Sequence, residues 1–507
     1  MNYSMYLCLL AATVGGMDSA KETPAEPELD DALEPALQRL RRLFEDFRGQ
    51  PGSPQAAFAL ERQVQAEVRE LARVGVEWAF NQSEPSRTDA LPSHVEFEGC
   101  PYTRLNRKTP QDVATTFGKI RLWRVGYRPT HKTGEPTIFP LAQQLGIVAG
   151  AAPALAERAA RYQAEAGATQ RRTLDRLKLE HGVAWGVKKL REVIERVAAA
   201  TAVERPEVQV EKLLQLLEQA WSSKGKHKPV LSVGRDGISI GVPVRGGTIF
   251  EVASAGTVSV LDRRGRRLGT VYLAYMPESK QGNMSQQLTR LLTEALRRWE
   301  RPQPRLCYVT DAGDNETTYY QTVLRRMLHP RTGERLPWVR VLDYYHASQR
   351  LWTMADALFG SGPVAKAWAR RMQKLLKQPN GVRRVLNSAA ALRSRRRLRG
   401  KAQQEFGKAY HYLRERTTSM RYADYKRVGL PCGSGVTEAA CKTIYTQRLK
   451  LSGMRWHKAG AQTILNLRVL LLSGVWTEAY QRALNTMENV KVPTYAANNT
   501  KRLKKAA

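Results

Sequence analysis

Three acidic residues stand apart in this sequence because of the elements that surround them. Asp236 follows a Val-rich run, Asp311 ends the apolar run RLCYVT, and Glu438 opens an Ala-rich helical pattern. Functional groups gather where the strands of open α/β sheets end. Carboxylates without paired cations repel one another unless they share metal ions, and Mg²⁺ prefers oxygen ligands of this kind. We therefore expect the three to form a catalytic site that holds two Mg²⁺ or Mn²⁺ ions.

Each of these carboxylates also has an ordinary structural interpretation. An acid in the first turn of a helix, such as Glu438, offsets the helix dipole and contributes about 0.3–1 kcal/mol. Asp236 and Asp311 are residue types that suit turns. Their joint placement at the ends of successive core elements favours catalysis. Two metal ions about 3.5–4 Å apart would support phosphodiester cleavage.

The segment around Glu438 reads GLPCGSGVTEAACKTIYTQRLK. Gly433 and Gly435 predict a tight backbone turn beside the site. Lys442 and Tyr445 follow Glu438 by four and seven residues, which puts them on the same face of the predicted helix. We expect Lys442 to contact a DNA phosphate as an accessory group.

Composition limits the partners of the protein. The chain has 507 residues, a formal net charge of +34 and a pI of about 10.2, which point to a polyanion partner. No stretch approaches the roughly 20 apolar residues that cross a bilayer, so nucleic acid is favoured over a membrane. The five scattered cysteines include no CxxC pair, which argues against a disulfide framework or a standard zinc site. A reduced, cytoplasmic protein is the simplest interpretation.

Hydrophobic periodicity predicts the elements that must position these groups. The alternation over 115–129 predicts a cationic strand with a bulge near Leu122, either a solvated strand or a ribbon on DNA. Residues 153–200 predict two helices with a break at His181-Gly182. This pattern fits a helix-turn-helix with DNA contacts at Lys188, Lys189 and Arg191, and it also fits any helical hairpin.

From about residue 228 the pattern changes to strands. The sequence predicts a strand pair with Asp236-Gly237 as a turn or strand-end signal, and then a hairpin over GTVSVLDRRGRRLGTVYLAYM. Helices over 283–300 and 315–328 separate two further strands, which gives a mixed α/β sheet with crossovers. A very basic helical segment over 364–416 includes the run Arg395, Arg396 and Arg397, which we expect to contact DNA.

These predictions divide the chain into seven segments. They are a flexible or untranslated lead (1–36), a helical and β-ribbon region (37–150), a helix-turn-helix-like region (151–222), the first part of a catalytic core (223–363), a basic helical insertion (364–428), the final core helices with Glu438 (429–480) and a basic C-terminal tail (481–507).

Four motifs resemble a known family. They read GRDGISIGV, YVTDAGDNE, VLDYYHASQRLW and GLPCGSGVTEAACKTIYTQRLKLSGMRWHKAGAQTILNLRVLLLSG, and they resemble bacterial insertion-sequence transposases of the Mutator-like DDE group. The resemblance covers roughly residues 95–480. It implies an RNase H-like catalytic fold with a helical insertion before the last acid, and an N-terminal DNA-binding region.

The resemblance also implies roles for single residues. The triad would be Asp236, Asp311 and Glu438, and an Asp-x-x-His element is matched by Asp343 and His346. His346 would contact the scissile strand or serve the structure alone. Members of the group usually show Asp-Gly-Ala at the second acid. This chain has Asp311-Ala312-Gly313 instead, followed by Asp314, which is a rival for that role.

The function expected from these observations is DNA transposition. The protein would bind terminal inverted repeats as a homo-oligomer, and would cleave and join double-stranded DNA in the nucleoid. One alternative is an RNase H-like nuclease or resolvase, and another is a transposase-derived DNA-binding protein without activity.

Overall fold

The computed structural model describes residues 28–49, 51–131 and 134–488. Within them the chain forms two compact units. The first takes its residues from the segments up to Gln163, from Ala168–Ala200 and from Tyr480 onward, and the second from Ala164–Gly167 and Thr201–Ala479. The boundary at residue 200 falls inside one long helix, so this helix contributes to both units.

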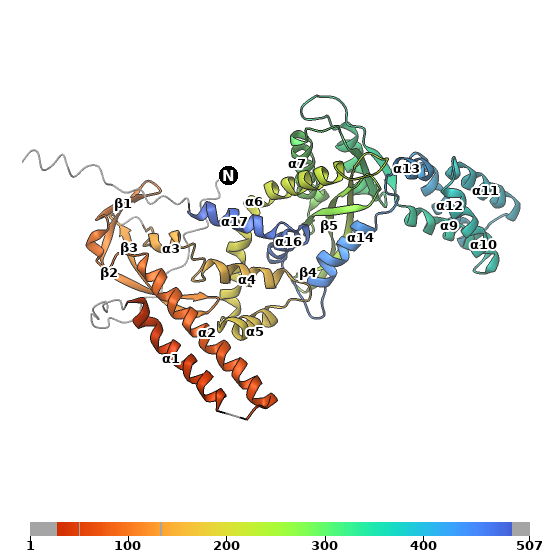
Figure 1. Cartoon of the computed structure of the whole chain (residues 1–507). Helices are drawn as coiled ribbons and strands as arrows, with labels where there is room; N and C mark the ends of the chain where they lie inside the picture. Colours follow the sequence, from red (N-terminus) through yellow and green to blue (C-terminus); the bar gives the residue numbers. More distant parts are fainter. Residues whose placement is uncertain (1–27, 50, 132–133, 489–507) are drawn as a thin grey trace, which may run out of the picture. The chain divides into compact units, whose positions relative to one another are not determined.

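The first unit combines helices with an antiparallel sheet. Helices α1 (Leu29–Arg48) and α2 (Pro54–Gln82) lie side by side (Figure 1). A three-stranded sheet of order β1-β2-β3 follows, and then come short helices and the start of the long helix. Their bounds are β1 (His94–Phe97), β2 (Cys100–Thr115), β3 (Gly118–Pro129), α3 (Pro140–Gln144), α4 (Pro153–Ala164), α5 (Gln170–His181) and α6 (Val187–Trp221).

The ends of the described chain differ from the predicted segments. Residues 29–36 are helical, although they belong to the segment predicted to be a flexible lead. At the other end, α17 (Trp476–Glu488) continues the helical structure into the predicted tail 481–507. The remaining parts of both segments, 1–27 and 489–507, lie outside the described residues.

Strand β3 shows the predicted slip in its alternation, with Ile120 and Leu122 buried first and then Val125 and Tyr127. The predicted bulge near Leu122 is wrong, because Leu122 pairs regularly with its partner on β2. The irregularity lies in β2 opposite Val125 and Tyr127, so the partner strand carries the extra residues.

The predicted helix break at Gly182 is confirmed, since this residue ends α5 with a left-handed φ of 66°. The apolar face expected on the next helix is buried, but α6 runs for 35 residues instead of closing a compact helix-turn-helix. Lys188 and Arg191 are exposed near its start. Lys189 is half-buried and lies 3.5 Å from Glu192.

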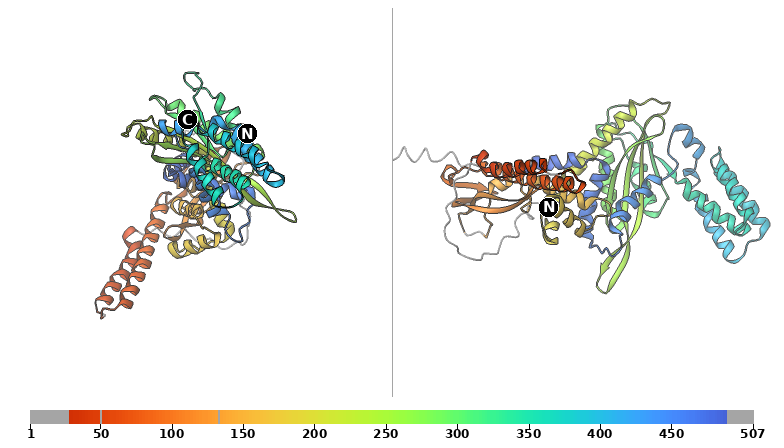
Figure 2. Two further views of the ribbon diagram at one scale, coloured as in Figure 1. Left: turned by 90° about the vertical axis from the view of Figure 1, so that its right-hand side faces the viewer. Right: turned by 60° about the horizontal axis from the view of Figure 1, so that its bottom comes forward.

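The second unit is built around a five-stranded sheet of order β6-β5-β4-β7-β8. β4 (Val230–Val244), β5 (Gly247–Leu261) and β6 (Arg267–Tyr275) pair antiparallel, and the hairpin formed by β4 and β5 projects from the sheet (Figure 2). β7 (Arg305–Thr310) and β8 (Val339–Leu342) run parallel to β4, with α7 (Gly282–Arg298) and α8 (Asp314–Thr322) in the crossovers. The predicted mixed α/β class is therefore confirmed.

One strand boundary was predicted wrongly. β4 continues through Asp236 and Gly237 without a break, because its pairing with β5 holds at all 15 positions and sets Asp236 opposite Ala255. Asp236 therefore lies within a strand and not after one.

The basic segment forms a helical lobe after β8, visible at the cyan and blue end of the second unit (Figure 1). The lobe comprises α9 (Tyr344–Phe359), α10 (Pro363–Leu376), α11 (Gly381–Arg396), α12 (Gly400–Glu415) and α13 (Tyr422–Val428). Its apolar interior is continuous with the buried side of β7 and β8, since Phe406 and Leu413 share one cluster with Val309 and Val341. The lobe is therefore anchored to the sheet by a common core.

The chain then returns to the sheet through α14 (Gly435–Cys441), a π-helical turn η6 (Lys442–Thr446), α15 (Gln447–Leu449) and α16 (Lys458–Ser473). α14 lies directly on β4 and β5. A Cβ at Gly234 would overlap the Thr437 hydroxyl, which hydrogen-bonds the Thr257 hydroxyl at 2.8 Å. The missing side chain at Gly234 thus permits the close approach of α14.

Gly234→Ala should therefore destabilise the second unit by about 1–3 kcal/mol, the usual cost of overpacking a tight core contact. Urea denaturation would measure this, with Gly247→Ala as the matched control because a Cβ at Gly247 meets nothing within 4 Å. Equal stability of the two variants would contradict the close approach of α14 at Gly234.

Candidate active site

The register of the parallel strands brings Asp236 and Asp311 together. β4 and β7 pair up to Val233 and Tyr308. Asp236 and Asp311 each follow these last paired residues by three positions. The charge of Asp311 raises the pKa of Asp236, which indicates that the two carboxylates lie near each other beyond the paired part of the strands.

The pairing of β7 with β8 places Asp343 next to Asp311. β7 and β8 pair up to Thr310 and Leu342, and one further residue sets Asp311 beside Asp343. The Asp343 N–H donates to the Thr310 carbonyl at 2.9 Å, which continues the ladder to this point. Asp311 and Asp343 therefore directly follow the last paired residues of two neighbouring parallel strands.

Asp236 is electrostatically coupled to the other two members of the predicted triad. Burial raises the pKa of its carboxyl, and the negative charges of Asp311 and Glu438 raise it further. Hydrogen bonds from the Gly237 N–H, at 2.7 Å, and from the Cys441 thiol oppose this rise in pKa. Asp311 and Glu438 are therefore both near enough to Asp236 for their charges to act on it.

Asp311 is held at the end of β7 from two sides. Its Oδ1 accepts from the Gly313 N–H at 3.0 Å, and its backbone carbonyl accepts from the Tyr412 hydroxyl of α12 at 2.5 Å. The rival Asp314 is exposed at the start of α8 and is not among the charges that shift the pKa of Asp236. The acid brought next to Asp236 is Asp311.

The unusual Ala312-Gly313 order has structural consequences. Ala312 has φ of 62°, in the left-handed region that costs a residue with a Cβ roughly 1–2 kcal/mol. A Cβ at Gly313 would lie 2.5 Å from Oε2 of Glu316. Gly313 thus leaves room for a carboxylate, while Ala312 occupies a conformation that favours glycine.

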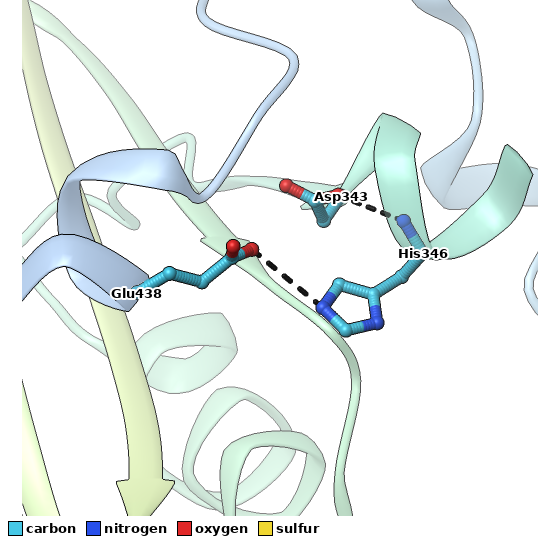
Figure 3. A group of neighbouring side chains, drawn as sticks. All are labelled: Asp343, His346 and Glu438. Carbon is cyan, nitrogen blue, oxygen red and sulfur yellow. Dashed lines mark hydrogen bonds and ion pairs between the residues drawn. The ribbon is translucent and has the colours of Figure 1, made fainter. Parts of the chain in front are cut away.

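Glu438 lies in the first turn of α14, as predicted. Its side chain is 48% exposed, its Oε1 accepts from the Ser434 hydroxyl at 2.7 Å, and His346 Nε2 lies 3.6 Å away (Figure 3). No Lys or Arg forms an ion pair with Asp236, Asp311 or Glu438 anywhere in 28–49, 51–131 or 134–488.

Asp343 is fully buried, and both oxygens of its carboxylate accept hydrogen bonds from neighbouring groups. Oδ1 accepts from the N–H groups of Tyr345, at 2.6 Å, and His346, at 2.9 Å, while Oδ2 accepts from the N–H and the hydroxyl of Ser434. These four bonds use the acceptor capacity of the carboxylate. Asp343 therefore positions α9 and the turn before α14.

Asp343, His346 and Glu438 also form a compact group in which one ligand atom from each lies within 4.8 Å of the others (Figure 3). Because Asp343 is engaged by three backbone N–H donors, and by the Ser434 hydroxyl when that proton is not donated to Glu438, His346 and Glu438 are the members that remain available to a ligand. The Ser434 hydroxyl lies 2.7 Å from oxygens of both Asp343 and Glu438, and its single proton can be donated to only one of them at a time.

Two expectations about the segment around Glu438 are wrong. Neither Gly433 nor Gly435 has a positive φ, and a Cβ at Gly435 would meet nothing within 4 Å, so neither glycine is needed for a tight turn. The π-helical turn η6 also breaks the predicted common face. Lys442 is exposed, whereas Tyr445 is fully buried and donates to the Ser254 carbonyl at 2.5 Å.

Sequence reasoning missed one acid of the site. Glu316 is only 7% exposed, and its pKa is raised by burial and then by the charges of Asp311 and Asp236. In the sequence it is one of two acids in the first turn of a helix, which is an ordinary pattern. It is also the last residue of the motif YVTDAGDNE, but the motif gave it no role, and no sequence signal predicted its burial.

All three arginines of the predicted run are exposed, but their contacts differ. Arg396 donates to the Leu358 carbonyl at 3.0 Å and lies over the Phe359 ring. Arg397 lines a cavity of about 500 Å³ between α11 and α12. The cavity is lined by Ala390, Arg393, Ser394, Arg397, Leu398, Gln403, Phe406, Tyr410 and Arg414, which include three cations and no acid.

The sequence matches no protein-family model, and no curated protein matches it significantly. Across 28–49, 51–131 and 134–488, no helix combines the length and the hydropathy that crossing a membrane requires.

The predicted triad offers carboxylate oxygens, which are ligands that Mg²⁺ and Mn²⁺ accept. The group found in the described part of the chain with its ligand atoms within 4.8 Å of one another is, however, Asp343, His346 and Glu438, and it shares only Glu438 with the triad. A shared ion would relieve the repulsion that raises the pKa of Asp236.

Asp236→Asn should raise the melting temperature of the metal-free protein at pH 7. The raised pKa means that the ionised carboxylate costs stability at neutral pH, and this cost fades as pH falls through the folded-state pKa. Each kcal/mol recovered would add about 2–4 °C, and the gain should shrink toward pH 4. Calorimetry in EDTA would measure it, with the exposed Asp314→Asn as a control that changes little. A lower melting temperature for Asp236→Asn would contradict the repulsion.

Proposed function

We propose that this protein is a DNA transposase of the DDE type that cleaves and joins DNA at the ends of its element. The observation that carries the proposal is that the charges of Asp311 and Glu438 both act on the half-buried Asp236, with no ion-paired Lys or Arg among the described residues, in a chain of net charge +34. A homo-oligomer bound to two DNA ends in the nucleoid would be the working form.

The topology of the second unit supports this function. Three antiparallel strands are followed by two parallel strands with helical crossovers, in the order β6-β5-β4-β7-β8. This arrangement agrees with the RNase H-like fold that the motif resemblance implies. The helical lobe between β8 and α14 corresponds to the insertion that the same resemblance places before the last acid.

The residues divide into those that would hold ions and those that position them. Asp236, Asp311 and Glu438 would hold Mg²⁺ or Mn²⁺, which supply Lewis acidity for hydrolysis of a phosphodiester and for attack by a 3′-hydroxyl. Ser434, fixed by Asp343, orients the Glu438 carboxylate. His346 lies beside Glu438, where it can contact the scissile strand. The freed 3′-hydroxyl would attack target DNA directly, without a covalent protein intermediate.

The cationic surface would hold DNA by its phosphates. Arg393, Arg397 and Arg414 line a cavity without any acid, and none of them forms an ion pair among residues 28–49, 51–131 and 134–488. Guanidinium groups bind phosphate oxygens through paired N–H donors. The exposed Lys188 and Arg191 on α6 are further candidates for DNA contacts in the first unit.

Glu438→Gln should abolish metal-dependent cleavage of DNA that carries the element's own ends, and should leave DNA binding unchanged. The substitution keeps the size of the side chain and removes one anionic ligand. Asp314→Asn is the matched control, since it removes an exposed acid near the site. If Glu438→Gln cleaves DNA as well as the wild type does, the catalytic assignment is overturned. Glu438 would then only interact favourably with the dipole of its helix, α14.

The same assay separates the alternatives. Strand transfer from pre-cut ends would yield joined products for a transposase and none for a nuclease or resolvase. Binding without cleavage in either Mg²⁺ or Mn²⁺ would identify an inactive DNA-binding derivative.

Arg393→Ala and Arg414→Ala should each weaken DNA binding and reduce the slope of log K against log salt by about 0.9 for each phosphate that the variant no longer neutralises. Fluorescence anisotropy at several salt concentrations would measure the slope. Arg384→Ala is the matched control, because this arginine is exposed on α11 but does not line the cavity. An identical slope for the cavity variants and the wild type would exclude the cavity as a phosphate-binding surface.

A further inference from the structure

Glu316 is a buried carboxylate next to the predicted triad. It lies in the first turns of α8, directly after the segment that carries Asp311. Only 7% of its surface is exposed. A buried carboxylate is costly unless a cation or several donors compensate it, so its surroundings decide its role.

No strong compensation for Glu316 exists among the described residues. Its carboxylate accepts a hydrogen bond from its own backbone N–H, and no ion pair links it to any Lys, Arg or His in 28–49, 51–131 and 134–488. The nearby cation is Arg235, whose guanidinium donates to Ser285 Oγ, at 3.1 Å, and Gln281 Oε1, at 2.7 Å. Arg235 attracts Glu316 through charge alone.

The position of the carboxylate points toward the acid site. From one point, the place a Cβ would take at Gly313, Glu316 Oε2 lies 2.5 Å away and Asp311 Oδ1 lies 3.6 Å away. Gly313 therefore keeps open the space in which these two carboxylates approach each other. The charges of Asp311 and Asp236 both act on Glu316, as they act on each other.

We propose that Glu316 is a fourth acidic group of the divalent-cation site and helps to hold the ion on the Asp311 side. This inference rests on the proposed function, because it assumes that Asp236, Asp311 and Glu438 hold Mg²⁺ or Mn²⁺. Glu316 is the last residue of the motif YVTDAGDNE, but neither the motif comparison nor the triad gives it a role. Its physical basis is that a divalent ion would supply the positive charge that this buried carboxylate lacks.

Isothermal titration of the full chain with Mn²⁺ tests the proposal without relying on activity. Glu316→Gln should weaken Mn²⁺ binding about 10-fold or more, the usual effect of removing a group that supports a metal site. In EDTA its melting temperature should equal or exceed that of the wild type, because like-charge repulsion is relieved. Asp314→Asn removes an exposed acid from the same helix and should bind Mn²⁺ as the wild type does.

A second variant tests the position of the carboxylate and not its charge. Gly313→Ala retains every charge but places a methyl group 2.5 Å from the present position of Oε2, so the flexible Glu316 side chain must move. This variant should also bind Mn²⁺ more weakly. It keeps the test decisive if Glu316→Gln does not fold.

The possible results distinguish a failure of the role proposed for Glu316 from a failure of the proposed function. Wild-type Mn²⁺ affinity in both Glu316→Gln and Gly313→Ala would overturn the role of Glu316 and leave the triad in place. A lower melting temperature of Glu316→Gln in EDTA, with unchanged affinity, would assign Glu316 to the fold. If the wild type does not bind Mn²⁺, the proposed metal site is contradicted, and so is the role proposed for Glu316.

Discussion

The candidate site depends on the parallel register of β4, β7 and β8. This register places Asp311 and Asp343 directly after neighbouring strand ends, with Asp236 three residues beyond the last β4 residue that pairs with β7. A shift of one residue would turn each side chain to the opposite face of the sheet. The apolar residues of β7 prevent such a shift, because five of its six positions are buried and must keep their packing.

The last acid of the triad depends on a different constraint, the close approach of α14 to the sheet at Gly234. Asp343 then ties the turn before α14 to the start of α9 through Ser434. The helical lobe takes part as well, since Tyr412 donates to the Asp311 carbonyl. The lobe and the acids are thus linked by hydrogen bonds, and a change in the lobe has a direct route to the position of Asp311.

The sequence predicts much of this structure where local patterns are strong. The hairpin formed by β5 and β6, helix α7 and the α/β class follow from alternation and helical periodicity. The continuity of β4 through Asp236-Gly237 was missed because pairing with β5 overrides a local turn signal. Glu316 was missed for a similar reason, since only tertiary packing buries it. Asp343 was expected as an accessory acid, yet its hydrogen bonds give it a positioning role.

The large positive charge of the chain does not neutralise its acid site. Charges on the surface are screened over about 8 Å at physiological ionic strength, so the many Lys and Arg side chains act on groups near them and only weakly on a distant, partly buried carboxylate. Compensation for Asp236, Asp311 and Glu316 must come from a group within a few ångströms, and Arg235 is already committed to other partners. The strongly cationic composition and the uncompensated acids are therefore two separate features. The first suits a polyanion on the surface, and the second suits a small, highly charged cation inside the site.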